Sequence, residues 1–486
     1  MMNPVTLAAA LLVLVSTLAV PARAARSIEF IHVPAFGQST DPVLTGRVHG
    51  GEAGAQRVAL YIRVGNGWWT KPTFVQPLTT IQSDGSWSAN IVSSGGDVNA
   101  TQIAAYLVPA SLIPPDVGGD PCVPLAVVAA SLASATVVRP NPALRNLHWS
   151  GLDWYLKDSA GARVGPGDNY FSDSTDQVWV DAQNRLHLRV SNVAGKWQCA
   201  EAITYRTLGY GRYVFRAETE VNSLDVNAVL GLFTWADRSE DPNHREIDIE
   251  WSRWGNASDS TNAQFVVQPY APTGHLQRIT IPAGTGSSVQ QWIWQTSGVA
   301  FQALAGADAL NWSYPAGNTV SANLPLSCDE SVHLNLWLCD NAGPAGGQPV
   351  EVVLSEFQHI PSDGDGDGMG DAWELAHGLA PASAADAASD DDGDGFTNLQ
   401  ECLADTDPAD RTSALLIASH ALTGSAPQIT FLSRPDKRYD LEGSDTLLPG
   451  SWTAIAADVA GTGTPVTVTL PPASGVTRKF YRARLK

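Results

Sequence analysis

The segment at positions 245–251, Arg-Glu-Ile-Asp-Ile-Glu-Trp, alternates acidic and apolar residues with a period of two. This period predicts a β-strand, because successive side chains of a strand point to opposite faces. Glu246, Asp248 and Glu250 would share one face, and the two isoleucines would enter a hydrophobic core. Three acids on one face repel each other and add no stability. The pattern therefore indicates a functional site on a sheet, with a solvated strand face as the alternative.

The spacing of the two glutamates suits the chemistry of glycosidic bonds. Cα atoms four residues apart on a strand are about 13 Å apart, from a rise of about 3.3 Å per residue. Two glutamate side chains that lean together close much of this gap, and a retaining glycosidase needs its carboxyl groups about 5–5.5 Å apart. Asp248 is too short to replace either glutamate, but it is close enough to influence both.

The surrounding sequence carries a resemblance to a known family. Its motifs are Gly-Tyr-Gly-Arg-Tyr at 209–213, Gly-Leu-Phe-Thr-Trp at 231–235, the acidic strand, Ala-Gln-Phe at 263–265 and His-Leu-Asn-Leu-Trp at 333–337. Their order and spacing resemble the catalytic domain of glycoside hydrolase family 16, over roughly positions 145–360. The resemblance implies a concanavalin A-like jelly-roll β-sandwich with a glycan cleft. It implies Glu246 as nucleophile, Glu250 as acid/base with a pKa raised by charge crowding, and Asp248 as the modulator of their charge.

The same resemblance implies a set of substrate contacts, because the apolar faces of sugars pack on aromatic rings. The expected substrate-binding residues are Trp235, Glu201, Gln264, Asn169, Tyr170, Trp197 and Trp254. Trp251 follows Glu250 directly and is expected in the core. His244-Arg245 replaces the Trp-Asp pair of lichenases, and Val266 replaces an asparagine of the family. A β-glucan is therefore the expected substrate without a defined linkage. A lectin-like protein without activity and a transglycosylase are the alternatives.

The chain divides by composition into five segments, and plentiful Gly and Pro with little helical periodicity predict an all-β fold. The expected segments are a signal peptide at 1–24, an N-terminal β module at 25–140 with carbohydrate binding as one interpretation, the catalytic sandwich at 141–360, a calcium-binding spacer at 361–412 and a C-terminal β module at 413–486. In the first module Trp68 and Trp69 are adjacent, so at most one of them can enter the core.

The first residues predict export. An apolar run at positions 7–20 is followed by Pro-Ala-Arg-Ala at 21–24, a cleavage pattern. No second apolar run is long enough to span a membrane, so we expect a secreted, extracellular protein, with a periplasmic or cell-surface location as the alternative. The net charge of −20 and the lack of basic patches argue against nucleic-acid binding. We expect a monomer whose partner is a polysaccharide.

Two acidic loops predict structural calcium. Fourteen acids and no Lys or Arg lie between positions 363 and 410. In each loop, acids and one glycine follow the spacing of a twelve-residue calcium loop. The expected ligands are Asp363, Asp365, Asp367, Asp371 and Glu374 in the first loop, and Asp390, Asp392, Asp394, Asn398 and Glu401 in the second. No helix is evident before either loop, so they resemble thrombospondin type 3 spacer repeats. Catalysis should not require this calcium.

Five cysteines leave at least one thiol without an intramolecular partner. Cys328 and Cys339 are nearest in sequence and form a candidate pair across a hairpin, although the pairing is not fixed by spacing.

Overall fold

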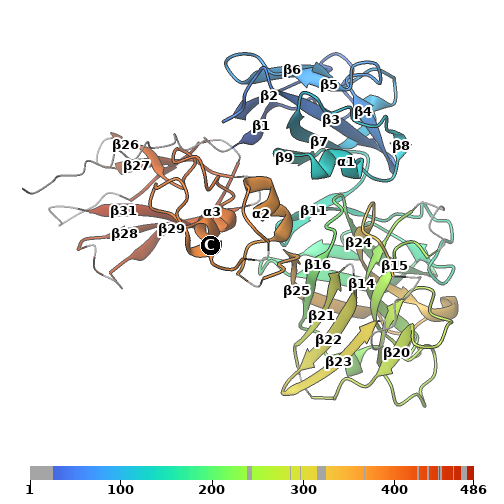
Figure 1. The fold of residues 1–486 in the computed structure, drawn as a ribbon. Helices are drawn as coiled ribbons and strands as arrows, with labels where there is room; N and C mark the ends of the chain where they lie inside the picture. Colours follow the sequence, from blue (N-terminus) through green and yellow to red (C-terminus); the bar gives the residue numbers. More distant parts are fainter. Residues whose placement is uncertain are drawn as a thin grey trace, which may run out of the picture.

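The computed structural model describes residues 26–237, 243–284, 286–295, 297–314, 324–365, 367–381, 383–423, 426–434, 437–446, 448, 451–462, 465–471 and 479–485. The expected signal peptide at 1–24 lies outside this part of the chain. The described residues form an all-β protein with a few short helices, and its β modules pack side by side (Figure 1).

The central module is a two-layered β-sandwich. The strands of its first layer, in spatial order, are β20 (Leu276–Ile279), β19 (Ala263–Val267), β18 (Ile247–Trp251), β17 (Ala228–Trp235), β24 (Ser331–Leu338), β15 (Lys196–Thr204), β11 (Leu152–Leu156) and β10 (Asn146–Trp149), with β12 (Tyr170–Phe171) on β15. Those of its second layer are β13 (Val178–Val180), β14 (Leu186–Val193), β25 (Val350–Pro361), β16 (Gly211–Ala217), β21 (Ser288–Gln295), β22 (Gly298–Ala305) and β23 (Asp308–Tyr314). The β14–β15 hairpin joins the layers.

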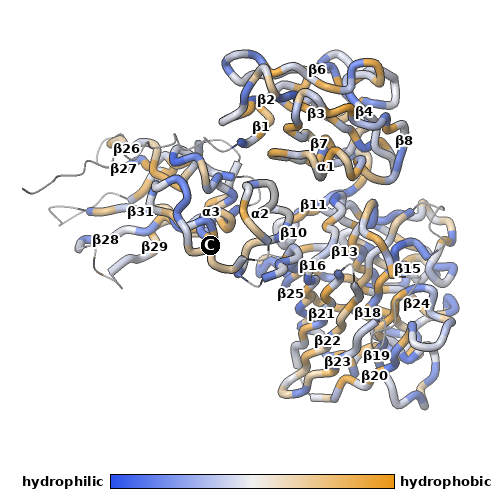
Figure 2. The backbone as a smooth tube through the Cα atoms, in the orientation of Figure 1, coloured by the Kyte–Doolittle hydropathy of each residue, from blue (hydrophilic) through white to orange (hydrophobic). Residues whose placement is uncertain are grey.

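One hydrophobic core fills the space between the two layers. Ile249 and Phe265 enter it from the first layer, and Phe215, Trp292 and Leu354 enter it from the second. These strands alternate apolar residues with polar ones (Figure 2), so each layer buries one face and leaves the other for solvent or ligand. The fold class thus agrees with the predicted jelly-roll sandwich, and the acidic strand β18 lies inside a sheet, between β17 and β19.

The N-terminal module consists of two small sheets around their own core. One sheet contains β1 (Ser27–His32), β2 (Val43–His49) and β6 (Ser86–Asn90). The other contains β8 (Gly118–Asp120), β4 (Gly67–Lys71), β3 (Gln56–Val64), β7 (Ala100–Pro109) and β9 (Ala133–Val138), with β5 (Leu78–Thr80) on β3, and α1 (Leu125–Ala129) lies nearby. Trp68 is buried and Trp69 is 36% exposed, which confirms that only one of the two rings joins the core.

The acidic spacer contains two short helices, α2 (Asp371–His377) and α3 (Asn398–Ala404), each beginning inside one of the acidic loops. The C-terminal module follows with two three-stranded sheets around a small core. Their strands are β26 (Ile417–Thr423), β27 (Ala426–Phe431) and β30 (Val466–Thr469), and β29 (Thr453–Ala460), β28 (Arg438–Ser444) and β31 (Phe480–Leu485). Helix α2 also packs next to β9 of the N-terminal module.

The cysteine pairing differs from the candidate pair. Cys328 bonds to Cys122, which joins the N-terminal module to the sandwich across a sequence separation of 206 residues. Cys339 is a buried free thiol, so the predicted Cys328–Cys339 pairing is wrong. The correct partner lies in another module, and sequence proximity carries no information about such a contact.

We expect the loss of this disulfide to lower the thermal stability of the whole chain. A variant with Cys122→Ser and Cys328→Ser should unfold at a lower temperature, because closing a long loop typically contributes about 2–4 kcal/mol. Differential scanning calorimetry measures the change. Cys402→Ser is the matched control, since Cys402 is a free thiol and its replacement should leave the melting temperature almost unchanged. Equal melting temperatures for all three proteins would contradict the cross-link.

Within the residues that the structure describes, no helix has the length and apolar character needed to cross a membrane.

Candidate active site

The strand β18 presents Asp248 and Glu250 to one side and its apolar residues to the core, as the alternation predicts, but it begins at Ile247, so Glu246 directly precedes the strand and is not part of it. Ile247, Ile249 and Trp251 are fully buried in the sandwich core. On the other face, Glu250 lies opposite Gly231 of β17 on one side. A Cβ at Gly231 would lie 2.5 Å from Oδ1 of Asn335, so only glycine fits beside the acids.

A tight turn fixes the point at which β18 begins. His244 and Arg245 both have φ of 53°, a left-handed conformation that costs on the order of 1–3 kcal/mol per residue. Thr234 holds this turn, since its hydroxyl donates to the Arg245 carbonyl at 2.8 Å and accepts from Ile247 N at 3.2 Å. Arg245 donates from Nε to Oδ1 of Asp329 at 2.8 Å. These contacts set the direction of the neighbouring Glu246.

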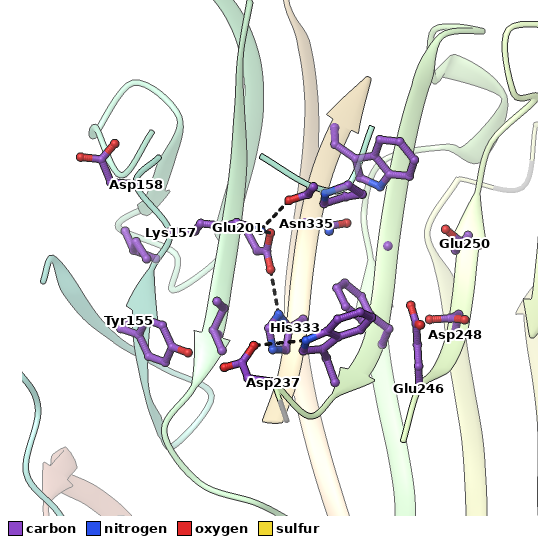
Figure 3. Close-up of a pocket in the computed structure, with 18 of the residues that line it drawn as sticks. Tyr155, Lys157, Asp158, Glu201, Asp237, Glu246, Asp248, Glu250, His333 and Asn335 are labelled. Atoms are coloured by element: carbon purple, nitrogen blue, oxygen red, sulfur yellow. Dashed lines mark hydrogen bonds and ion pairs between the residues drawn. The ribbon is translucent and has the colours of Figure 1, made fainter. Parts of the chain in front are cut away.

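Glu246, Asp248 and Glu250 all line one cavity of about 560 Å³. The charged and titratable residues of its lining are Lys157, Asp158, Glu201, Asp237, Glu246, Asp248, Glu250 and His333. The aromatic residues of the lining include Tyr155, Phe233, Trp235 and Trp337. Figure 3 shows Glu246, Asp248 and Glu250 on one side of this cavity and Glu201 with Lys157 on the other. Apolar rings combined with a few polar groups are typical of ligand pockets.

Burial raises the pKa of every acid in this trio. The pKa of Glu246 rises to about 8 and that of Glu250 to about 7, and the pKa of Asp248 lies well above its usual range. A hydrogen bond between Asp248 and Glu246 lowers the pKa of Glu246 and raises that of Asp248. When Glu246 is ionised, the proton of this bond must lie on Asp248, because an ionised carboxylate can only accept. The three carboxyl groups cannot all be ionised near neutral pH.

The raised pKa of Glu250 agrees with the expected direction, but its cause differs from the predicted charge crowding. Burial is the largest contribution, and the nearby groups of Gln264 and Arg278 oppose it.

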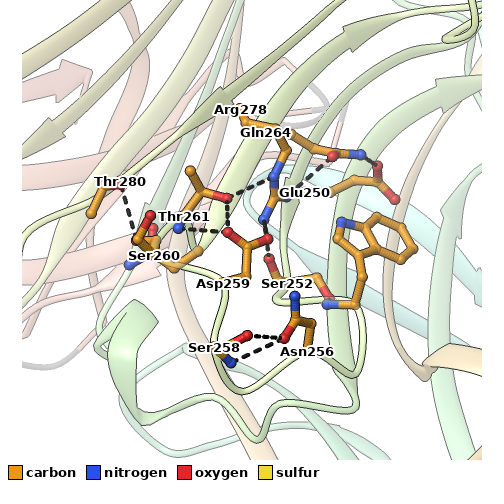
Figure 4. Close-up of polar contacts among 12 residues, drawn as sticks. Glu250, Ser252, Asn256, Ser258, Asp259, Ser260, Thr261, Gln264, Arg278 and Thr280 are labelled. Atoms are coloured by element: carbon orange, nitrogen blue, oxygen red, sulfur yellow. Dashed lines mark hydrogen bonds and ion pairs between the residues drawn. The ribbon is translucent and has the colours of Figure 1, made fainter.

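A chain of hydrogen bonds positions Glu250 (Figure 4). Gln264, opposite Glu250 on β19, donates from Nε2 to Oε2 of Glu250 at 2.6 Å. Arg278 on β20 donates to Oε1 of Gln264 at 3.1 Å, to Oδ2 of Asp259 at 3.0 Å and to the Ser252 carbonyl at 3.1 Å. Because the Gln264 oxygen accepts from Arg278, its amide nitrogen must face Glu250. This arrangement fixes the Glu250 carboxyl in one orientation.

The opposite wall holds a second polar cluster. Glu201 is buried, and its two oxygens accept from Lys157 Nζ at 2.8 Å and contact His333 Nδ1 at 2.7 Å. These partners lower the pKa of Glu201 against the effect of burial. Glu201 is thus an ionised group that orients the two other side chains in the cavity wall.

The other predicted substrate contacts divide into two groups. Trp235 lines the cavity, and its ring stacks on His244 with centroids 4.0 Å apart. Tyr170, Trp197 and Trp254 do not line it, and Trp254 packs edge-on against Trp337. Asn169 is buried and donates from Nδ2 to the carbonyls of Pro166 and Leu338, so it supports the rim loop from behind. Direct substrate binding by Asn169, Tyr170, Trp197 and Trp254 stays a prediction.

Sequence reasoning missed several residues of the site. Arg278 reaches it only through the pairing of β19 with β20, and Lys157, Asp237 and His333 come from three further segments. His333 belongs to the His-Leu-Asn-Leu-Trp motif at 333–337, so the sequence did offer a reason to include it in the site. The other three stand in no recognisable pattern.

In the spacer at 361–412, the acidic loops place carboxylates close to one another in three groups. Asp363, Asp365 and Asp367 have ligand atoms within 4.8 Å of one another, and so do Asp390, Asp392 and Asp394. A third such group contains Asp367, Glu374 and Asp386. Asp386 lies outside the twelve-residue spacing, which is why the sequence did not indicate it.

Several side chains of the spacer carry buried oxygens without hydrogen-bond partners among the described residues. Glu374 is fully buried with both oxygens in this state, and Asn398 Oδ1, Glu401 Oε2 and Asp407 Oδ2 are similar. Buried oxygens of this kind are costly unless a cation binds them, and several such oxygens together fit a hard cation such as Ca²⁺. Asp371 instead accepts from Gly364 N at 2.5 Å, and it is not in any of the three groups.

Neither a protein-family model nor a curated protein sequence matches this chain. Among solved structures 130 chains match, and they include β-glucanases. The β-glucanase of Bacillus licheniformis is 18% identical with a TM-score of 0.34, over 44% of this chain and 94% of that chain. A non-specific endo-β-1,3(4)-glucanase from glycoside hydrolase family 16 is 13% identical with a TM-score of 0.33, over 42% and 83%. A protein of Mycobacterium tuberculosis described as an immunostimulatory antigen and pseudo β-1,3-glucanase is 17% identical with a TM-score of 0.32, over 44% and 90%. Identities and TM-scores this low do not assign an activity or a site residue to this chain.

Proposed function

We propose that the sandwich is a retaining, endo-acting glycoside hydrolase of the family 16 type that cleaves a neutral β-glucan. The observation that carries the proposal is that Glu246, Asp248 and Glu250, at the start of β18 and along it, line one cavity and that each glutamate has a different hydrogen-bond partner. Asp248 favours the ionised form of Glu246, and Gln264 orients the carboxyl of Glu250. These are the needs of a nucleophile and of an acid/base.

The proposed reaction has two steps. Glu246 attacks the anomeric carbon while Glu250 donates its proton to the leaving glycosidic oxygen, which breaks the bond and leaves a glycosyl ester on Glu246. Glu250, now ionised, takes a proton from water, and the water oxygen attacks the anomeric carbon and releases Glu246. Burial raises the pKa of both glutamates, which supports Glu250 as a proton donor, and the hydrogen bond from Asp248 lowers the pKa of Glu246 against this burial, which supports Glu246 as the group that ionises when substrate is bound.

The charge of the cavity supports a neutral substrate. Its lining contains six acids against one lysine and one histidine, and both of these bases are bound to Glu201. A sulfated or carboxylated glycan would meet uncompensated carboxylates here, which disfavours its binding. The polar groups and rings of the lining suit the hydroxyls and apolar faces of glucose units.

An assay of reducing-end release against a panel of glycans tests this function. We expect the protein to cleave at least one of mixed-linkage β-glucan, linear β-1,3-glucan and xyloglucan, and to leave sulfated red-algal galactans intact. Transfer to added sugar acceptors in the same assay would point to a transglycosylase. Binding of a β-glucan without cleavage by the folded protein would refute the hydrolase and favour a lectin-like role.

Replacement of Asp248 should move the acid limb of the pH–rate profile. In Asp248→Ala the hydrogen bond to Glu246 is lost, so the pKa of Glu246 rises and the nucleophile is protonated at a higher pH. We expect the acid limb of kcat/KM to shift upward by about one to two pH units, since a hydrogen bond to a charged group is worth about 1.5–3 kcal/mol. Asp248→Asn is the matched control, because its amide can still donate. An unchanged limb in Asp248→Ala would contradict the proposed role.

We also propose that the spacer binds structural calcium and that the protein works outside the cytoplasm as a monomer. The buried, partnerless oxygens of Glu374 and Glu401 support calcium as the ion that neutralises these loops. The Cys122–Cys328 disulfide supports an oxidising compartment, as does the apolar leader of the chain.

A further inference from the structure

A second cavity, of about 200 Å³, lies at the junction of the N-terminal module and the sandwich. The N-terminal module contributes Arg63, Gly65, Asn66, Thr101 and Gln102 to its wall, and residues of the sandwich form the rest. Leu144, Tyr155, Trp235 and Asp237 line this cavity and the active-site cavity alike. The two cavities therefore adjoin along these residues, and together they are called the groove, with the three acids in one cavity and residues of the N-terminal module in the other.

The junction is built as a fixed wall. Arg63 is buried and donates to the Asp329 carbonyl at 3.1 Å, and Gln102 donates from Nε2 to the Tyr205 carbonyl. Within the sandwich, the Tyr205 hydroxyl accepts from Asn141 N at 3.0 Å, which holds the Tyr205 side of this contact in place. The Cys122–Cys328 disulfide closes the same contact covalently. An independent module on a flexible linker would have none of these contacts, so the N-terminal module is part of the groove.

The chemistry of the junction suits a neutral sugar. Leu144 is 38% exposed and lies where the two cavities meet, next to the rings of Tyr155 and Trp235. These surfaces can pack on the apolar face of a pyranose. Asn66 in the β3–β4 turn is exposed and lines the second cavity, so a sugar that occupies this cavity would meet a polar, uncharged side chain there.

The one cation that the N-terminal module brings to this wall does not favour an anionic ligand. Arg63 lies among Asp329, Glu330 and Asp237, whose charges raise its pKa against the larger effect of burial. Its charge is therefore compensated within the protein. A neutral glycan chain that occupies both cavities meets no uncompensated positive charge at this end.

We propose that the N-terminal module supplies a distal sugar-binding subsite of the catalytic groove, with Asn66 as a specificity-determining residue for longer glucan chains. The identity of the ligand rests on the proposed β-glucan hydrolase. Because the module lies at one end of the groove, only a glucan chain long enough to extend from the three acids to the module would contact it.

The test compares Asn66→Trp, which fills the junction, with Gln38→Trp, which puts the same ring on an exposed position of the same module outside both cavities. The probes are a trisaccharide and a hexasaccharide of β-1,3-, mixed-linkage β-1,3-1,4- and β-1,4-glucan. For the linkage that wild type cleaves, we expect Asn66→Trp to raise the ratio of the hexasaccharide KM to the trisaccharide KM about tenfold. This is the effect expected when one sugar-binding subsite is blocked. Gln38→Trp should leave this ratio at the wild-type value.

A binding measurement separates this subsite from the proposed activity. Calorimetric titration of the hexasaccharides into Glu246→Gln, with and without Asn66→Trp, should show the same tenfold weakening without turnover. Weakened binding in a protein whose wild type cleaves nothing would refute the hydrolase and keep the subsite. Cleavage by wild type, with an unchanged KM ratio and unchanged binding in Asn66→Trp, would overturn the subsite and keep the hydrolase. Absence of both binding and cleavage would overturn both.

Discussion

Glu246→Gln is expected to lose hydrolysis by a factor of about 10⁴ or more in kcat, with the fold intact. The amide has the shape of the carboxyl group and can still accept the hydrogen bond from Asp248, but it cannot form the glycosyl ester. Loss of a covalent nucleophile removes the entire two-step route, so the effect is far larger than that of a binding residue. Reducing-end release from the β-glucan that wild type cleaves measures it.

Two further proteins make this result specific to the site. Glu356→Gln is the matched control, because Glu356 lies on the second layer in an exposed ion pair with Arg216 and should leave kcat unchanged. Glu246→Ala leaves room for a small anion, and added azide should restore turnover with a glycosyl azide as product. Activity of Glu246→Gln within tenfold of wild type would show that this residue is not the nucleophile.

Removal of calcium is expected to destabilise the spacer strongly and to leave the catalytic step almost unchanged. A cation that binds only the folded state contributes about 2.7 kcal/mol per site at a concentration of one hundred times Kd. We therefore expect a large drop in the melting temperature of the spacer after chelation and its recovery with added Ca²⁺. The kcat should persist, since none of the predicted calcium ligands lines the active-site cavity.

The pH dependence of this effect follows from Glu374. Without metal, burial and then the charges of Asp365 and Asp367 raise its pKa to about 7. Ionisation of such a group costs folding free energy, because the unfolded chain ionises it near pH 4.3. The metal-free protein should therefore lose stability as the pH rises from about 4.5 to 7, whereas the calcium-loaded protein should not.

Two single variants test the calcium site, and each replaces one carboxylate of an acidic loop with its amide. Glu374→Gln should abolish most of the calcium-dependent gain at the first loop. Asp391→Asn, in an exposed position of the second loop that belongs to no carboxylate cluster, should keep the gain. Equal melting temperatures with Ca²⁺ and with chelator in the wild type would refute the structural calcium.

Local pattern explains which parts of the site could be predicted from the sequence. The alternation around Asp248 is decided by the strand itself, so both the core side and the acidic side followed from a period of two. The twelve-residue spacing likewise predicted Glu374 and Glu401 as calcium ligands, and both carry buried oxygens without hydrogen-bond partners among the described residues. In both cases the chemistry lies within one short segment.

The remaining parts depend on contacts between distant segments. Arg278 supports Glu250 only because β20 pairs with β19, and Asp386 joins the first acidic loop after the chain has returned to it. The pairing of Cys122 with Cys328 requires the packing of two modules. The resemblance in sequence implied Asn169 as a substrate contact, but its position behind the rim loop is set by the carbonyl of Leu338.

The stereochemistry of the first product tests the central claim most directly. Proton NMR of fresh reducing ends, recorded during the cleavage of a β-glucan and before mutarotation, distinguishes one displacement from two. Double displacement through Glu246 predicts that the β-anomer forms first and that the α-anomer appears later by mutarotation. Initial release of the α-anomer would contradict the roles assigned to Glu246 and Glu250.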